Sequence, residues 1–289
     1  MGHQILKTSR LKKLLDRAMP IILSLGVFLA VATVAGLIID VVSSGWHRLS
    51  PGLLTNYASA NPAEAGLRSA FLGTIYTVGL SAIICIPLSI ATALYLTEFS
   101  GTGRLSSILR YNIANLAGVP SIIFGVVGLG FLVYGLGMGR SIIAGAFTLA
   151  ILTLPLVTVT CIEAINTVPD DLRLGAYALG ATKLQVAAHV LLPRALPMML
   201  TGGILGISRA IGEAAPILVI SGLLFIREDP VSLFDIFTVM PLQLFNWISR
   251  PQMAFRELAS AGIIVLLLLL LGLNAAAIVL RHRLTRRLT

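Results

Sequence analysis

Long apolar runs bounded by charged residues constrain this sequence more than any other feature. A helix needs about 20 residues to cross the hydrocarbon core of a bilayer, which is about 30 Å thick. Charged residues make up only 11% of the chain, compared with about 25% in soluble domains. We therefore predict an all-α polytopic membrane protein with six transmembrane helices. The expected spans are residues 18–42, the stretch between Arg68 and Glu98, the stretch between Arg110 and Arg140, the stretch between Arg140 and Glu163, the stretch after Arg194, and Leu258–Leu280.

Basic residues predict how these helices are oriented. The cytoplasmic ends of membrane helices carry an excess of Lys and Arg, and the chain is strongly basic at residues 1–17 and 281–289. An even number of spans places both termini on one side, so we expect both in the cytoplasm. The net charge of +9 lacks the basic stripe with interleaved aromatic residues that is typical of nucleic-acid binding. Membrane lipid is the expected partner, and nucleic acid is not.

The spans also predict how the chain is divided. The first apolar run is longer than the core of about 7–15 residues in a cleaved signal peptide, so we interpret it as a transmembrane helix. Within the core we expect a cytoplasmic loop at 167–193. At 225–255 we expect an aromatic-rich periplasmic segment that lies at the membrane interface or caps the bundle. The expected parts are a basic cytoplasmic tail (1–17), a first transmembrane helix (18–42), a periplasmic loop (43–67), a core of five helices (68–280) and a basic cytoplasmic tail (281–289).

The third span contains a proline that is expected to break it. The sequence Gly118-Val119-Pro120 interrupts a glycine-rich run, and a proline inside a membrane helix frees backbone groups that neighbours or a water-filled cavity must satisfy. Two polar residues, Asn115 and Ser121, flank the break. They either form hydrogen bonds between helices or line a polar pathway, and the sequence leaves both interpretations open.

The polar loop between the fourth and fifth spans carries signals for two short helices. Two Asp residues directly follow Pro169, an arrangement that favours the first turn of a helix, and Gly180 is a natural left-handed cap for its end. Thr182 and Gln185 have the spacing of a capping box, and we expect Pro193 to end the second helix. A loop built in this way can dock on a partner or lie along the membrane surface.

The fifth span contains two charged residues, Arg209 and Glu213. Counted from Pro197, Arg209 lies 12 residues along, or about 18 Å at 1.5 Å per residue, near the middle of the bilayer. Glu213 lies one turn further on the same face. An arginine at mid-membrane costs about 2.5–3.5 kcal/mol, and charges tolerated there usually mark a pathway. We predict that the pair contacts a transported anion; the alternative is an ion pair that only fixes helix packing.

The sequence contains no motif for catalysis, metal binding or nucleotide binding. A Gly-x-x-x-x-Gly-Lys-Ser/Thr loop, HExxH and GxSxG are all absent. We therefore expect a non-catalytic chain without a cofactor, so that any ATP is hydrolysed by another subunit. Cys85 and Cys161 lie inside apolar spans and are interpreted as packing residues. Glu163 ends the fourth span as a gate or as a solvated helix end, and we favour the second.

The loop between spans four and five resembles the EAA loop of ABC-importer permeases. That loop reads Glu-Ala-Ala, three residues, Gly, nine residues and Ile-x-Leu-Pro, and the spacing is met throughout this sequence. Two residues depart from it, because Leu174 stands where the family has Glu and Gly175 where it has Ala. The resemblance implies that this loop couples the chain to an ATPase. The residues concerned are Leu174, Gly175, Ala176, Gly180, Val190, Leu192 and Pro193.

Three further segments, 118–125, 208–216 and 241–247, resemble the A-type permease subunit of phosphate-specific ABC transporters, and the similarity runs from about residue 65 to the C-terminus. The resemblance implies a type I ABC-importer permease fold in the bacterial inner membrane, and ATP-driven import of inorganic phosphate by alternating access. It implies three partners: a related permease subunit that forms a heterodimer, a cytoplasmic ATPase dimer and a periplasmic phosphate-binding protein. The alternatives are a permease of the same fold for another oxyanion or small solute, an ATP-independent secondary transporter or channel, and a membrane scaffold.

Overall fold

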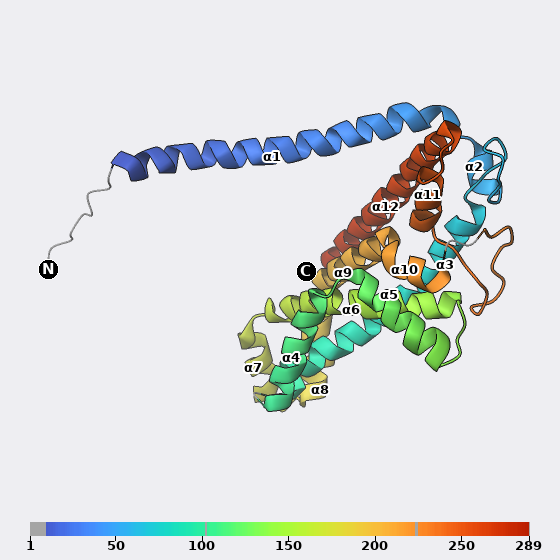
Figure 1. Cartoon of the computed structure of the whole chain (residues 1–289). Coiled ribbons are helices and arrows are strands. Elements are labelled where there is room, and N and C mark those ends of the chain that lie inside the picture. Colours follow the sequence, from blue (N-terminus) through green and yellow to red (C-terminus); the bar gives the residue numbers. More distant parts are fainter. Residues whose placement is uncertain (1–9, 102, 223–224, 289) are drawn as a thin grey trace.

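The computed structural model describes residues 10–101, 103–222 and 225–288, and these are mostly helical (Figure 1). Within these ranges, the β structure is limited to an isolated antiparallel bridge between Ser141 and Ile236. The α-helices are α1 (Arg10–Gly45), α2 (Pro51–Thr55), α3 (Arg68–Leu94), α4 (Arg104–Ala117), α5 (Ser121–Val127), α6 (Ile142–Asn166), α7 (Asp170–Ala178), α8 (Lys183–Gln185), α9 (Leu192–Gly212), α10 (Ala215–Ser221), α11 (Met240–Ile248) and α12 (Met253–Leu288). The shorter turns are the 3-10 turn η1 (Trp46–Arg48) and the π-helical turns η2 (Tyr95–Phe99), η3 (Gly128–Gly135) and η4 (Val186–Leu191).

The helices confirm the prediction of an all-α membrane protein. Among the described residues, five helices are long and apolar enough to span a bilayer, and a bent pair makes six if its two arms count as one span. The arms of that pair, Arg104–Ala117 and Ser121–Gly135, meet at 108°. The bend falls at Gly118–Pro120, as the sequence predicts, because a proline disfavours helical backbone in the residue before it. The third span is therefore bent rather than straight.

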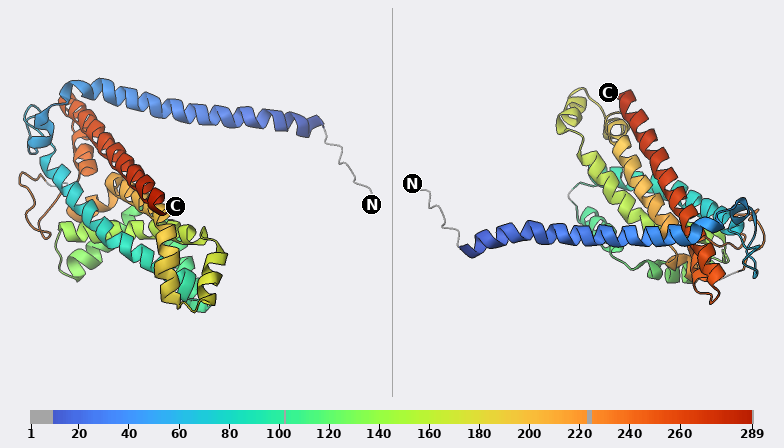
Figure 2. Two further views of the ribbon diagram at one scale, coloured as in Figure 1. Left: turned by 180° about the vertical axis from the view of Figure 1, so that it is seen from behind. Right: turned by 90° about the horizontal axis from the view of Figure 1, so that it is seen from above.

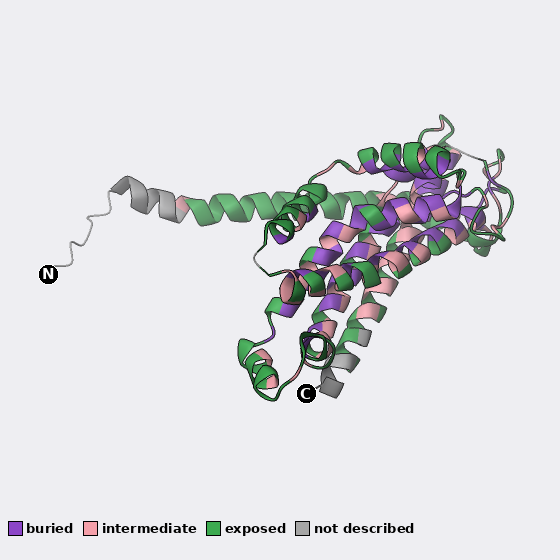
Figure 3. Cartoon of the chain, turned by 90° about the horizontal axis from the view of Figure 1, so that it is seen from below, coloured by how far each residue is buried: buried purple, intermediate pink, exposed green. Residues whose placement is uncertain are grey.

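The central helix of the bundle is α6, which packs against both α3 and α9. The side of α9 that faces α6 is lined by glycines: Gly202 lies against Thr160, and Gly206 lies against Val157. Small residues let membrane helices approach closely. Buried residues accordingly follow the length of these helices, as Figure 3 shows in purple.

Helix α1 leaves the rest of the chain and runs outward from it (Figures 1 and 2). It meets α12 close to its own C-terminal end, where Gly45 lies against the backbone of Ala261. Every side chain from residue 19 to residue 40 is exposed. In a bilayer this apolar surface must be covered by lipid or by another subunit.

The prediction that Pro193 ends a short helix is wrong. The helix that begins at Lys183 continues through η4 into α9 and forms one stretch from Lys183 to Gly212. Pro193 lies in the first turn of α9, where the missing N–H of a proline is tolerated. The π turn η4 directly before it widens the hydrogen-bond ladder and accommodates the ring.

At the opposite end of the bundle from α7 and α8, α11 caps the core. It packs against α12 and α3, and its Trp247 is fully buried beside Phe255, with ring centroids 6.4 Å apart. Other apolar residues of this region, among them Val231 and Phe234, are exposed. The region expected at 225–255 thus combines a buried helix with an exposed, extended segment.

Candidate functional site

The fifth span is interrupted beside its two charged residues. Helix α9 ends at Gly212, Glu213 has extended backbone (φ −80°, ψ 112°), and α10 begins at Ala215. Pro216 in the first turn of α10 has no N–H to donate to the carbonyl of Gly212, so the helical ladder cannot continue across this point. The sequence predicts both charges in this span but not the break.

Arg209 and Glu213 form an ion pair across this break. Arg209 Nε lies 3.4 Å from Glu213 Oε1, which agrees with the predicted spacing of one helical turn. Arg209 belongs to the last turn of α9, where the free carbonyls favour a cation. Its side chain is 39% exposed and that of Glu213 is 17% exposed. The pair therefore lies at the surface of this chain, where the Arg209 side chain is partly accessible to another molecule.

The interior beside α9 is too tightly packed to provide a path. The cavity that α3, α6 and α9 enclose, lined by Ser81, Cys85, Thr153 and Gly206 among others, has a volume of about 10 Å³, roughly the space of one water molecule. Arg209 does not line it. An anion that contacts Arg209 would therefore travel along the surface of this chain.

The two interrupted spans meet close to their breaks. Helix α5 packs against α10, and Gly125 lies directly against the backbone of Pro216. Ser121, predicted to flank the pathway, is the first residue of α5 and is half-buried, whereas Asn115 is exposed near the end of α4. Among the described residues, no hydrogen bond joins either of them to Arg209 or Glu213. Their predicted role in the pathway stays a prediction.

The loop between α6 and α9, residues 167–193, has the turn geometry that its sequence predicts. Helix α7 carries Asp170 and Asp171 in its first turn. Gly180 has a φ of +84°, a conformation that costs other residues about 1–2 kcal/mol. Thr182 Oγ1 accepts a hydrogen bond from the Gln185 backbone N–H at 3.3 Å, and the Gln185 side chain accepts one from the Thr182 N–H at 2.8 Å. This is the predicted capping box.

The two faces of this loop differ. Toward the bundle, Ala176, Val190 and Leu192 pack on an apolar core that includes Ile165, Val186 and Leu191. Away from it, Leu174, Leu179 and Leu184 are 65%, 91% and 68% exposed, and Gly175 has no neighbour where a side chain would begin. The loop is therefore fixed rigidly on the bundle and presents leucines outward.

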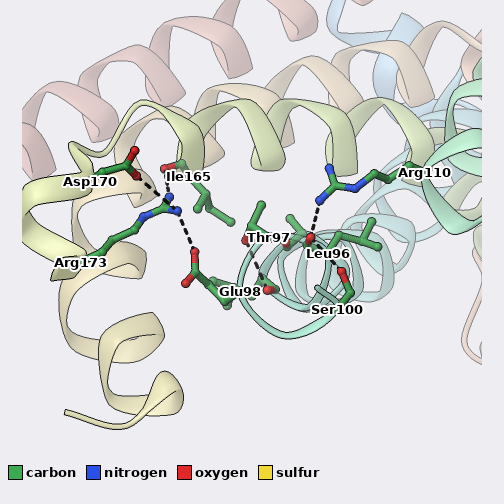
Figure 4. Close-up of polar contacts among 10 residues, drawn as sticks. Leu96, Thr97, Glu98, Ser100, Arg110, Ile165, Asp170 and Arg173 are labelled. Atoms are coloured by element: carbon green, nitrogen blue, oxygen red, sulfur yellow. Dashed lines mark hydrogen bonds and ion pairs between the residues drawn. The ribbon is translucent and has the colours of Figure 1, made fainter. Parts of the chain in front are cut away.

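A buried polar cluster joins the loop to α3 (Figure 4). Arg173 of α7 lies 3.1 Å from Glu98 of η2 and donates a hydrogen bond to the carbonyl oxygen of Ile165 at 3.0 Å. The side chains of Arg173 and Glu98 are 18% and 6% exposed. The sequence analysis used Glu98 only as the boundary of a span, since no local signal links residues so far apart.

Comparison with known proteins identifies the family of this chain. Residues 86–289 match the family described as binding-protein-dependent transport system inner membrane component. The chain belongs to this family. It is 33% identical over 253 residues to the phosphate transport system permease protein PstA 1 of Mycobacterium tuberculosis (strain CDC 1551 / Oshkosh), covering 86% of this chain and 79% of that protein. It is 28% identical over 290 residues to the probable ABC transporter permease protein YqgI of Bacillus subtilis (strain 168), covering 96% and 99%.

Solved structures of importers share the fold of this permease. The inward-facing MetNI methionine ABC transporter matches with a TM-score of 0.59 at 16% identity, over 73% of this chain and 94% of that one. An amino acid ABC transporter with histidines matches with a TM-score of 0.56 at 18% identity, over 74% and 92%. The predicted type I ABC-importer permease fold is therefore confirmed. As a permease of this family, the chain acts with an ATPase and a substrate-binding partner.

The permease also carries an ion pair at the opposite end of the bundle. Arg68 Nε donates to both carboxylate oxygens of Asp229 at 3.0 Å, and its guanidinium lies 5.1 Å from the ring centre of Tyr57. The hydrogen bond from Arg68 lowers the pKa of Asp229 below its ordinary value. This pair ties the exposed segment before α11 to the start of α3.

Glu163 is exposed near the end of α6, and together with Arg110 of α4 it lines a cavity of about 240 Å³. This position is compatible with both interpretations of Glu163, as a gate and as a solvated helix end. Within the described ranges, no three His, Cys, Asp or Glu side chains form a cluster that could hold a metal ion.

Proposed function

We propose that this permease imports inorganic phosphate by alternating access, driven by ATP that a separate subunit hydrolyses. The observation that carries the proposal is the Arg209–Glu213 pair, in which a partly exposed arginine side chain lies at a helix break in a membrane span. The similarity to phosphate transport permeases supports the choice of substrate.

The chemistry of the pair suits phosphate. A guanidinium presents planar N–H groups that bind two oxygens of a phosphate at once. Glu213 contacts Arg209 at Nε, and among the described residues the terminal N–H groups of Arg209 form no hydrogen bond, so they are available to an anion. The negative charge of Glu213 also limits the affinity, which lets the anion leave. A carboxylate can accept a hydrogen bond from a protonated phosphate oxygen, which sulfate lacks at neutral pH.

The exposed surfaces support the proposed partners. A second, related permease would cover the face that carries Arg209 and complete a path that the packed interior of this chain lacks. An ATPase dimer would dock on the outward leucines of the 167–193 loop. We place that loop and both termini in the cytoplasm, following the basic residues. The Arg68–Asp229 end then faces a periplasmic phosphate-binding protein.

The experiment is uptake into proteoliposomes that contain the permease pair and the ATPase, with the binding protein added outside. The proposal predicts uptake of labelled phosphate that needs ATP and survives an excess of sulfate. If an excess of sulfate abolished the uptake, the substrate of this permease would be a different oxyanion. Uptake that persists without the ATPase would instead identify a secondary transporter.

A further inference from the structure

The π turn η2, at the end of α3, is a junction on which two other elements, α4 and α7, converge. Its Glu98 faces Arg173 of α7, and its Leu96 carbonyl oxygen accepts a hydrogen bond from Arg110 of α4. Directly after the turn, Ser100 Oγ donates to Ser106 Oγ of α4 at 2.9 Å. Figure 4 shows the contacts of Glu98 with Arg173 and of Leu96 with Arg110 around one turn of backbone. A movement of α7 can therefore reach α3 and α4 through this junction.

The contact between Arg173 and Glu98 adds little to the attachment of α7. The loop is already held by apolar packing of Ala176 on the core. Removing two charges from water offsets much of their attraction, and replacing a buried ion pair with apolar residues is often neutral or stabilising. Stability alone thus gives no reason to keep these charges buried.

The geometry of the pair indicates a contact that is not optimised in this arrangement. Glu98 Oε1 lies 3.1 Å from Arg173 Nη1, but the contact does not have the geometry of a hydrogen bond. Glu98 Oε1 and Arg173 Nε are both buried and, among the described residues, form no hydrogen bond. Buried polar atoms are usually satisfied, and exceptions call for an explanation. A π turn is also frequent at functional sites. Both features fit a link that changes its alignment when α7 moves relative to α3.

We propose that Arg173 and Glu98 are positioning residues that transmit the movement of α7 to α3 and α4, and so keep ATP hydrolysis coupled to transport. Arg173 directly precedes Leu174, the position where the resemblance places a family Glu, but the Arg173 side chain points into the bundle whereas Leu174 is exposed. The inference rests on the proposed function, because it needs an ATPase that acts on the 167–193 loop.

The test compares the phosphate taken up per ATP hydrolysed in proteoliposomes that contain the complete transporter. Glu98→Gln removes the charge but keeps the shape of the side chain. We expect the ratio to fall about fivefold or more, the lower range of coupling between two sites, while the complex assembles and hydrolyses ATP. The matched control is Asp170→Asn. Asp170 also faces Arg173, at 3.8 Å, but its side chain is 83% exposed, so we expect no change.

A double variant covers the case in which Glu98→Gln fails to assemble. Glu98→Met with Arg173→Met replaces the ion pair by apolar contact, which should restore assembly but not coupling. A wild-type ratio in assembled Glu98→Gln, or in the double variant, would overturn the inference. Absence of phosphate uptake by the wild-type complex would instead contradict the proposed function, so the two failures are distinguishable.

Discussion

Gly125 of α5 lies against Pro216 of α10, so closely that a Cβ on Gly125 would come within 2.7 Å of the Pro216 Cα. This contact joins the two interrupted spans of the permease. Pro216 lies three residues after Glu213, where the helix is interrupted. Because α5 contacts the backbone of Pro216, its position affects the conformation of the segment that carries the charged pair. A glycine is required here because the neighbouring atoms are backbone and cannot move aside as a side chain can.

Gly125→Ala is expected to destabilise the permease by about 1–3 kcal/mol, the usual range for overpacking. Thermal unfolding in detergent measures the change. Gly130→Ala is the matched control, because Gly130 lies in the same glycine-rich region and has no neighbour within 4 Å of an added Cβ. Equal unfolding temperatures for Gly125→Ala and the wild type would show that α5 and α10 are not in contact.

Gly180→Ala is expected to lower the stability of the folded 167–193 loop by about 1–2 kcal/mol. The positive φ of Gly180 is unfavourable for any residue with a Cβ. Gly175→Ala, in the interior of α7 with open space around it, should instead stabilise the helix by about 0.5–1 kcal/mol. Hydrogen exchange of the loop amides would report both changes. Slower exchange in both variants would contradict the left-handed cap.

The segment before α11 is expected to be released by acid. Because Arg68 lowers the pKa of Asp229 in the folded protein, the pair stabilises the fold at pH values above the ordinary Asp pKa, and this stabilisation is lost as the pH falls through the lowered one. Asp229→Asn should produce the same release at neutral pH, seen as faster hydrogen exchange at residues 225–236.

Glu228→Gln is the control for that experiment, since Glu228 is exposed and has no hydrogen bond or ion pair with the described residues. Protection that is the same in Asp229→Asn and in the wild type would show that Arg68 does not hold the segment.

Glu213→Gln tests how the permease separates phosphate from sulfate. With the negative charge removed, Arg209 should bind either anion more tightly, and a hydrogen bond specific to protonated phosphate should weaken. We expect wild-type uptake to resist sulfate. In this variant we expect sulfate to inhibit uptake by about tenfold, equivalent to about 1.4 kcal/mol. Unchanged resistance to sulfate would place the discrimination elsewhere, such as in the binding protein.

Local signals in the sequence predicted the parts of this fold that depend on neighbouring residues. The bend at Pro120, the cap at Gly180 and the capping box of Thr182 each follow from a few adjacent side chains. The same approach failed at Pro193, because the π turn before it accommodates the ring and the helix continues.

Contacts between distant parts of the chain could not be predicted in this way. The charges of Arg209 and Glu213 were visible because they share one helical face, but the ion pairs of Arg173 with Glu98 and of Arg68 with Asp229 join different elements. Their pairing depends on how α3, α6 and α7 pack, which the periodicity of one span does not specify. The exposure of Arg209 likewise depends on how α9 packs against α3, α6 and α12.

The most direct test of the central claim is the rate of ATP-driven phosphate uptake by Arg209→Gln in proteoliposomes that contain the complete transporter. Loss of hydrogen bonds to a charged group corresponds to about 1.5–3 kcal/mol, so uptake should fall about tenfold or more. Arg104→Gln, which removes an exposed charge without a partner among the described residues, should leave uptake unchanged. Wild-type uptake by a fully assembled Arg209→Gln transporter would contradict the account, because the anion would then cross without meeting this guanidinium.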